Sequence, residues 1–227
     1  MEAIALLGGP REQWPQNIKE RFEKARKKNK LIFSGDRGTL ILKQWGLTPD
    51  VAVGDFDSIK KNEKKRTLEN IPDVRFSNPV KDYTDSEQLL VTALQEYQVD
   101  NLEIYGATGG RIDHLLVNLF TFLHSPLQEY LNKVSLVDKQ NIIYFCKTGK
   151  TQFPYQEGYN YIGFGNLTPV EDFEIKDARY ELSDFSSKVP QMFSSNEFLR
   201  SKKAIKISLK KGIVIAIYSR DEKRFFS

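Results

Sequence analysis

The chain has 227 residues, of which 40% are hydrophobic and 28% charged, proportions typical of a globular protein with a buried core. Its 34 basic and 30 acidic residues give a net charge of +4, and because the two signs are mixed along the chain the composition argues against nucleic-acid binding. No signal peptide and no apolar run of about 20 residues is present, so we expect a cytoplasmic protein that does not enter a membrane.

The first two-thirds of the chain alternates between strand patterns and helix patterns. Strands are expected at 4–7, 31–33, 51–53, 74–76 and 102–105, and helices at 16–28, 39–45, 59–70, 86–97 and from 112 onward. The helix at 59–70 carries a basic run, which we interpret as a solvated lysine-rich surface. The alternation predicts an α/β fold whose mostly parallel sheet is covered by helices.

The pattern changes near residues 147–151. Beyond this point come short alternating or β-branched runs at 159–164, 204–209 and 213–218, which predict an antiparallel β domain. The last two runs flank Lys210-Lys211-Gly212, for which we predict a hairpin turn. The strands expected between 134 and 145 fit either domain.

Acidic residues follow the predicted strand at 51–53. Asp55 and Asp57 stand two residues apart, so in extended backbone both carboxylates lie on one face and reach one cation. Mg²⁺ prefers such hard oxygen ligands when a substrate phosphate completes its shell. Alternatively, Asp57 or Ser58 caps the helix that we expect from Ile59.

A second acidic cluster follows the predicted strand at 74–76. Thr84 and Glu87 fit a capping box at the start of the next helix. The capping box leaves Lys81, Asp82 and Asp85 unexplained. A lysine beside carboxylates suits a site in which the lysine neutralises phosphate oxygens and the carboxylates hold the metal ion.

A glycine-rich segment, 106–111, joins the strand at 102–105 to the following helix. Its glycines allow close backbone approach, the helix N-terminus offers free N–H groups to an anion, and Arg111 adds a planar donor suited to phosphate. The alternative is a flexible turn with Asp113 placed favourably in the first helical turn. These clusters all follow predicted strands, where ligands bind in open α/β sheets.

Three segments together resemble the thiamine pyrophosphokinase family in order and spacing: 48–59, 81–85 and 106–118. The resemblance implies an N-terminal α/β catalytic domain at 1–147, which binds ATP and Mg²⁺, and a C-terminal β-sandwich at 148–227, which binds thiamine. It also implies a homodimer with thiamine bound between subunits. The family transfers the pyrophosphoryl group of ATP to the thiamine hydroxyl, giving thiamine diphosphate and AMP.

The resemblance carries roles onto matching positions of this chain. The implied Mg²⁺ ligands are Asp55, Asp57 and Asp85, and the implied catalytic set adds Lys81, Asp82 and Arg111. The residues expected around the nucleotide are Asp36, Ser58, Thr84, Gly106, Thr108, Gly109, Gly110, Asp113 and His114. Tyr180, Ser195 and Asn196 are expected on the thiamine side. The chain departs from the family around Asp36, where Arg37 replaces a usual glycine.

Two other activities fit part of the pattern. An aspartyl-phosphate phosphatase uses an Asp-x-Asp motif after a strand, with Asp55 as the nucleophile, but it leaves the cluster at 81–85 and the C-terminal domain without a role. A non-catalytic nucleotide or thiamine binder does not need the complete acidic set.

Overall fold

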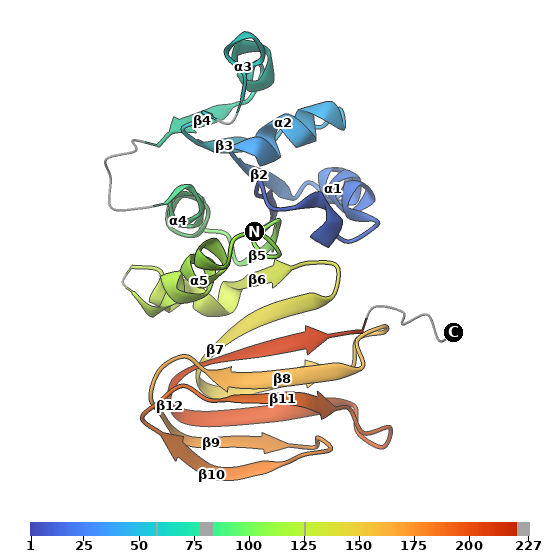
Figure 1. Cartoon of the computed structure of the whole chain (residues 1–227), viewed down its shortest axis with the longest axis vertical. Helices are drawn as coiled ribbons and strands as arrows, with labels where there is room; N and C mark the ends of the chain where they lie inside the picture. The colour runs from blue at the N-terminus through green and yellow to red at the C-terminus, as the bar shows by residue number, and fades with distance from the viewer. Residues whose placement is uncertain (58, 78–83, 125, 222–227) are drawn as a thin grey trace. The chain divides into compact units, whose positions relative to one another are not determined.

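The computed structural model describes residues 1–57, 59–77, 84–124 and 126–221. The chain divides into two compact units, Met1–Lys139 and Gln140–Ser227 (Figure 1). The boundary expected at 147 falls inside strand β7 (Asn141–Pro154), while β6 (Val134–Val137) belongs to the first unit. The strands that fitted either domain are therefore divided between the two.

The first unit contains a parallel sheet in the order β4-β3-β2-β1-β5-β6. Each neighbouring pair is parallel, as the alternating sequence pattern predicted. With β6, its strands are β1 (Glu2–Leu6), β2 (Leu31–Gly35), β3 (Val51–Gly54), β4 (Asp73–Phe76) and β5 (Asn101–Tyr105). The central strands are buried along almost their whole length, because helices cover both faces of the sheet.

The helices of this unit separate onto the two faces of the sheet. They are α1 (Ile18–Lys27), α2 (Arg37–Gln44), α3 (Lys61–Leu68), α4 (Asp85–Val91), continued by the π-helical turn η2 (Thr92–Glu96), and α5 (Ile112–Phe120). Figure 1 shows α1 and α2 on one side of the sheet and α4 and α5 on the other. Among the described residues, no helix has the length and apolar character that crossing a membrane requires.

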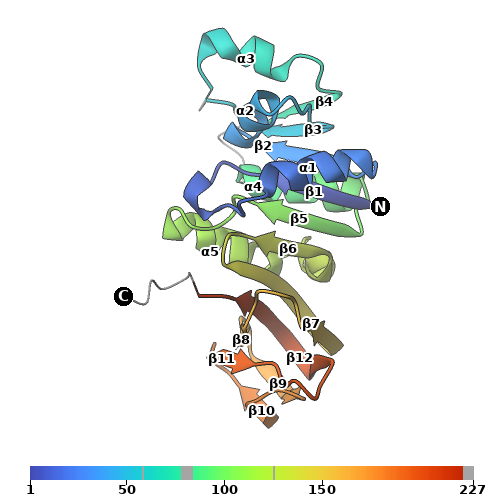
Figure 2. The ribbon, with the colours of Figure 1, turned by 90° about the vertical axis from the view of Figure 1, so that its right-hand side faces the viewer.

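The strand order of this sheet reverses between β1 and β5. From β1 the strands β2, β3 and β4 follow one another outward in the sheet. The next strand, β5, pairs with the other side of β1. Figure 2 shows the carboxyl ends of the parallel strands along one side of the unit. Ligands of open α/β sheets bind at such a reversal of strand order, just beyond the carboxyl ends.

The second unit is antiparallel, as predicted for the C-terminal part of the chain. Its centre is β12 (Ala204–Ser219), which pairs with β7 along nearly its whole length. The first half of β12 also pairs with β9 (Val170–Lys176), and its second half pairs with β8 (Tyr161–Asn166). The remaining strands, β10 (Leu182–Ser187) and β11 (Met192–Glu197), pair with β9 and β8 respectively.

The hairpin turn predicted at Lys210-Lys211-Gly212 is wrong. The three residues lie inside β12, where the register with β7 shifts between Leu209 and Ile213. Gly212 has a φ of +113°, and a Cβ there would lie 2.5 Å from the carbonyl oxygen of Pro169. The glycine therefore marks an irregularity within one long strand rather than a reversal of the chain.

Candidate functional site

The acidic motif after β3 forms a tight turn at the carboxyl edge of the sheet. Phe56 adopts a φ of +55°, and the backbone N–H of Asp57 donates to Oδ1 of Asp55 at 2.9 Å. The extended backbone expected between the two aspartates is therefore wrong. Their carboxylates converge because the chain turns at Phe56, whose ring is fully buried and anchors the turn to the protein interior.

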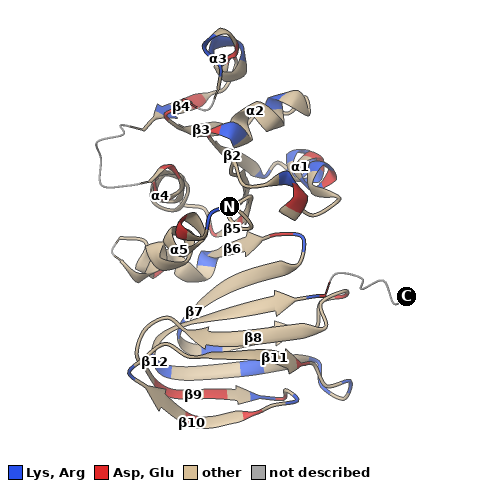
Figure 3. Ribbon diagram, viewed as in Figure 1, with Lys and Arg blue, Asp and Glu red and all other residues tan. Residues whose placement is uncertain are grey.

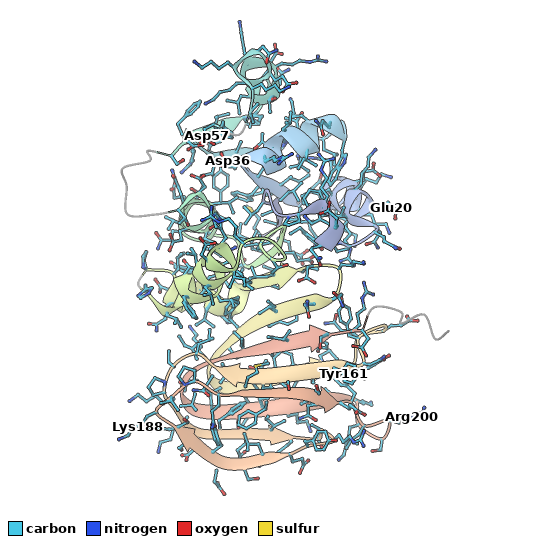
Figure 4. All side chains as sticks on the ribbon, viewed as in Figure 1. Glu20, Asp36, Asp57, Tyr161, Lys188 and Arg200 are labelled. Atoms are coloured by element: carbon cyan, nitrogen blue, oxygen red, sulfur yellow. The ribbon has the colours of Figure 1, made fainter. Side chains whose placement is uncertain are left out.

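Asp36, at the end of β2, completes a group of three carboxylates. One carboxylate oxygen each from Asp36, Asp55 and Asp57 lie within 4.8 Å of one another, an arrangement that suits a cation. Figure 4 shows Asp36 and Asp57 close together on the first unit. The acid predicted to complete a metal site with Asp55 and Asp57 was Asp85, whereas Asp36 was expected near the nucleotide.

Asp36 is held in an unusual conformation and carries a perturbed charge. Its φ is +38°, its N–H donates to the carbonyl of Val53, and its Oδ1 accepts from the N–H of Phe56 at 2.9 Å. Burial, together with the carboxyl groups of Asp85 and Asp55, raises the pKa of Asp36 to about 7. Negative charge is therefore crowded at this point, as at a site that receives a cation.

Gly54 makes room for the Asp36 carboxyl group. A Cβ built on Gly54 would lie 2.2 Å from Oδ1 of Asp36, and the φ of Gly54 is +150°. Any side chain at this position would displace the Asp36 carboxylate or the end of β3. A glycine after the buried strand is therefore part of the geometry that brings the acids together.

The second acidic cluster lies at the start of α4. Thr84 caps the helix: its side chain accepts from the N–H of Glu87, and Oε2 of Glu87 accepts from the N–H of Thr84 at 2.8 Å. The predicted capping box is thus confirmed. Asp85 opens the helix beside Asp36. Ser58, Lys81 and Asp82 lie outside the described residues, so their predicted roles stay predictions.

The glycine-rich segment between β5 and α5 is held by hydrogen bonds to residues outside it. Thr108 is buried, and its hydroxyl donates to Oδ2 of Asp138 at 2.7 Å. The Asn118 amide donates to the carbonyl of Ala107 at 2.8 Å. Gly106 has a φ of +73°, and its carbonyl accepts from the N–H of Gly9. The segment is therefore a fixed loop that places backbone groups at the start of α5.

The polar side chains at the start of α5 face solvent. Arg111 and Asp113 form an exposed ion pair, with Nε of Arg111 3.1 Å from Oδ1 of Asp113. The backbone N–H of His114 also donates to Asp113, and the side chain of His114 is exposed. Since both side chains of this ion pair are exposed, the guanidinium of Arg111 is accessible to an anionic ligand.

Sequence reasoning missed Asp138. It directly follows β6, whose assignment to a domain was left open, and its carboxylate is buried beneath the glycine-rich loop. A polar residue after a β-branched run is the same signal that identified the other clusters. The signal does not single out Asp138, because the run from 134 to 145 fits either domain and therefore has no predicted place in the sheet.

The residues expected on the thiamine side lie together in the second unit. Asn196 is buried, its Nδ2 donates to the carbonyl of Tyr180 at 2.7 Å, and its Oδ1 accepts from the N–H groups of Tyr180 and Glu197. Tyr180 itself is 57% exposed and lies under the guanidinium of Arg179. Ser195, beside them, has a φ of +58°. Asn196 thus fixes the backbone of Tyr180, from which the exposed ring extends.

Family models match both units of the chain. The model described as "Thiamin pyrophosphokinase, catalytic domain" matches residues 22–134, and "Thiamin pyrophosphokinase, vitamin B1 binding domain" matches residues 150–214. A curated relative from Bacillus subtilis, named thiamine pyrophosphokinase, is 31% identical over 223 residues, covering 97% of this chain and 100% of the relative.

Solved structures of similar proteins share the fold. A thiamin pyrophosphokinase family protein from Enterococcus faecalis is 31% identical, with a TM-score of 0.87 over 98% of this chain and 100% of its own. The yeast thiamin pyrophosphokinase has a TM-score of 0.71 over 96% of this chain and 86% of its own. At 15% identity, the yeast protein shows likeness of fold alone.

Proposed function

Because the chain belongs to the thiamine pyrophosphokinase family, we propose that it transfers the pyrophosphoryl group of ATP to the hydroxyl group of thiamine, giving thiamine diphosphate and AMP. The single observation that supports this reaction most directly is the convergence of Asp36, Asp55 and Asp57 at the carboxyl edge of the parallel sheet. Transfers of this kind depend mainly on positioning and on offsetting the charge of the phosphates.

The acidic group fits a divalent metal ion. Its oxygens are hard ligands, and they come from two loops that the fold brings together. The pKa of Asp36 is raised first by burial and then by the neighbouring carboxyl groups of Asp85 and Asp55. Asp55, Asp57 and Asp36 would hold Mg²⁺, with Asp85 at the same edge. The ion, when bound, supplies positive charge to the phosphate oxygens of ATP.

The loop between β5 and α5 is the proposed phosphate-binding element. Its backbone and the N-terminus of the nine-residue helix α5 present N–H groups, and Arg111 adds charge. Asp138 and Asn118 fix the loop through Thr108 and Ala107, so the N–H groups keep their direction. Lys81 and Asp82 remain proposed contacts of the nucleotide.

Thiamine is proposed to contact Tyr180 in the second unit. The thiazolium ring of thiamine is a cation, and an exposed aromatic face attracts cations. Asn196 and Arg179 hold the backbone and the ring of Tyr180 in place, which lowers the cost of ordering the aromatic face on binding.

A homodimer is part of the same proposal. Three large apolar residues of α5, Ile112, Leu116 and Phe120, are 72%, 41% and 42% exposed and stand at intervals of four residues. They form one stripe on the helix, of a kind that marks a contact surface on many proteins. A second copy of the chain is the partner that the family resemblance implies.

The test is AMP formation from ATP, Mg²⁺ and thiamine. Asp57→Ala should lower turnover at least about 100-fold while leaving the circular dichroism spectrum unchanged, because one carboxylate of the acidic group is lost and Asp57 is exposed. Glu20→Ala is the matched control, since Glu20 lies on α1, away from Asp36 and Asp57 (Figure 4).

Other outcomes point to the other activities. Release of phosphate from simple monoesters without ATP would favour a phosphatase with Asp55 as the nucleophile. Binding of ATP or thiamine without AMP formation would favour a non-catalytic binder. Near-normal turnover of Asp57→Ala would contradict the proposed metal site.

A further inference from the structure

Helix α3 carries a basic run that the proposed reaction does not use, and one of its lysines differs from the rest. Figure 3 shows the concentration of basic residues on α3. Lys61, Lys65 and Arg66 are exposed, whereas Lys64 is half-buried. The interpretation of the run as a solvated surface therefore fits its neighbours but not Lys64.

The side chain of Lys64 is directed at the acidic turn after β3. Its Nζ donates to the backbone carbonyl of Asp55 at 2.7 Å. The same ammonium group lies 5.8 Å from the ring centroid of Phe56 and 5.6 Å from that of Phe76. The two rings meet edge to face, at 5.6 Å and 79°, so they form an aromatic corner against which the ammonium group packs.

These contacts act on the residue that makes the turn. Phe56 has a left-handed backbone conformation, which is unfavourable for a residue with a side chain, and it separates the two acids Asp55 and Asp57. Lys64 holds the carbonyl on one side of Phe56 and the ring of Phe56 itself. It thus links the acidic turn to α3, while Asp36 links the same turn to β2 through the N–H of Phe56.

The charge of Lys64 has a second effect. Three carboxylates lie within 4.8 Å of one another, and their mutual repulsion opposes the arrangement that a metal ion needs. An ammonium group bonded to the carbonyl of Asp55 adds positive charge beside this group without occupying a carboxylate oxygen. The carboxylates stay available as ligands.

We propose that Lys64 is a positioning residue for the metal site: it fixes the turn at Phe56 so that Asp55 and Asp57 converge before the metal ion binds. The inference rests on the proposed metal site, since Lys64 acts only through those carboxylates. Residues that orient metal ligands typically change metal affinity about 10–100-fold when they are replaced.

The experiment measures Mn²⁺ binding, by electron paramagnetic resonance of the free ion, to five purified full-length proteins: the unchanged protein, Lys64→Met, Lys64→Arg, Lys65→Met and Asp57→Asn. Lys64→Met keeps the aliphatic chain but loses the donor and the charge, and it should raise the dissociation constant at least about tenfold. Lys64→Arg keeps both and should stay within about threefold of the unchanged protein. Lys65→Met removes an exposed lysine from the same helix and should bind as the unchanged protein does.

A kinetic measurement separates positioning from general loss of structure. Lys64→Met should raise the Mg²⁺ concentration needed for half-maximal AMP formation about tenfold, with an unchanged KM for thiamine. Equal changes in both constants would overturn the inference in favour of a purely structural role. If Lys64→Met does not fold, a Lys64→Arg protein that folds but binds Mn²⁺ at least tenfold more weakly would also contradict the inference.

Asp57→Asn distinguishes a failure of the proposed metal site from a failure of the proposed role of Lys64. If Asp57→Asn binds Mn²⁺ poorly while Lys64→Met binds it as the unchanged protein does, the metal site stands and the role of Lys64 is wrong. If the unchanged protein binds no Mn²⁺, or Asp57→Asn binds it equally well, the proposed metal site fails and the role of Lys64 fails with it.

Discussion

At the scale of single residues, Asp36 is a carboxyl group placed where its charged form is unfavourable. It is half-buried, it adopts a left-handed backbone conformation, and other carboxyl groups lie near it. Sites that bind or react with charged groups often contain such residues. The cost of the negative charge should appear in the stability of the metal-free protein.

The pKa of Asp36 predicts a pH dependence. Its pKa is about 7 in the folded protein and near 3.8 in the unfolded chain, so the folded state binds more protons between pH 4 and 7 and loses stability as pH rises through this range. With metal removed by EDTA, Asp36→Asn should therefore be about 1–2 kcal/mol more stable than the unchanged protein at pH 8, a range discounted for solvent screening.

The difference between the two proteins should be much smaller near pH 4, where Asp36 is protonated in the folded state and only about half ionised in the unfolded chain. Asparagine keeps an oxygen that accepts from the N–H of Phe56, so the local hydrogen bond remains. Urea unfolding at both pH values measures the difference. A difference of the same size at pH 4 and pH 8 would contradict the raised pKa.

Asn196 gives a second prediction for a single residue. Asn196→Ala removes the partners of three backbone groups, on Tyr180 and Glu197, and should lower the free energy of unfolding by about 2–3 kcal/mol. It should also raise the KM for thiamine more than it changes the KM for ATP. Asn160→Ala, at an exposed position, is the control and should stay within about 0.5 kcal/mol.

The sequence was sufficient to find most of these residues but not their arrangement. Asp55 and Asp57 stood out because they follow a buried strand. That Asp36 rather than Asp85 forms the three-acid group with them depends on the turn at Phe56 and on the neighbouring positions of β2 and β3. The half-buried state of Lys64 follows from its contacts with Asp55, Phe56 and Phe76, which lie outside its own helix, so no local pattern reports it.

At the scale of elements, the carboxyl end of β3 depends on Gly54. Gly54→Ala should abolish Mn²⁺ binding, because the added methyl group would overlap the Asp36 carboxylate. Gly149→Ala is a matched control: Gly149 also has a positive φ, +128°, but nothing lies within 4 Å of its Cβ position. The control should cost about 1 kcal/mol of stability from backbone strain alone and leave Mn²⁺ binding unchanged. Equal Mn²⁺ affinities for the two variants would contradict the steric argument.

Elements with strong local signals were predictable. The local sequence alone is enough to recognise the capping box at Thr84 and Glu87 and the alternation of strands and helices. The hairpin predicted at 210–212 failed because a glycine between two β runs is compatible with a turn and with a bulge. Pairing with β7 on both sides of the irregularity decides between them, and that pairing joins residues far apart in the sequence.

At the scale of the whole molecule, the proposed dimer predicts a mass. Light scattering coupled to size-exclusion chromatography should give about twice 26.2 kDa. Leu116→Glu should shift the protein toward the monomer, because it places a charge in the exposed apolar stripe of α5. A monomeric mass for the unchanged protein would exclude the dimer, and an unaffected dimer in Leu116→Glu would place the interface elsewhere.

The long strand β12 has a consequence for how the protein is made. It pairs with β7, β8 and β9, so these three earlier strands share a neighbour that the ribosome synthesises after all of them. The parallel unit needs only the first 139 residues and is complete while translation continues. Until residues 204–219 emerge, β7, β8 and β9 lack this shared neighbour, so we expect the nascent antiparallel unit to aggregate more readily than the finished one.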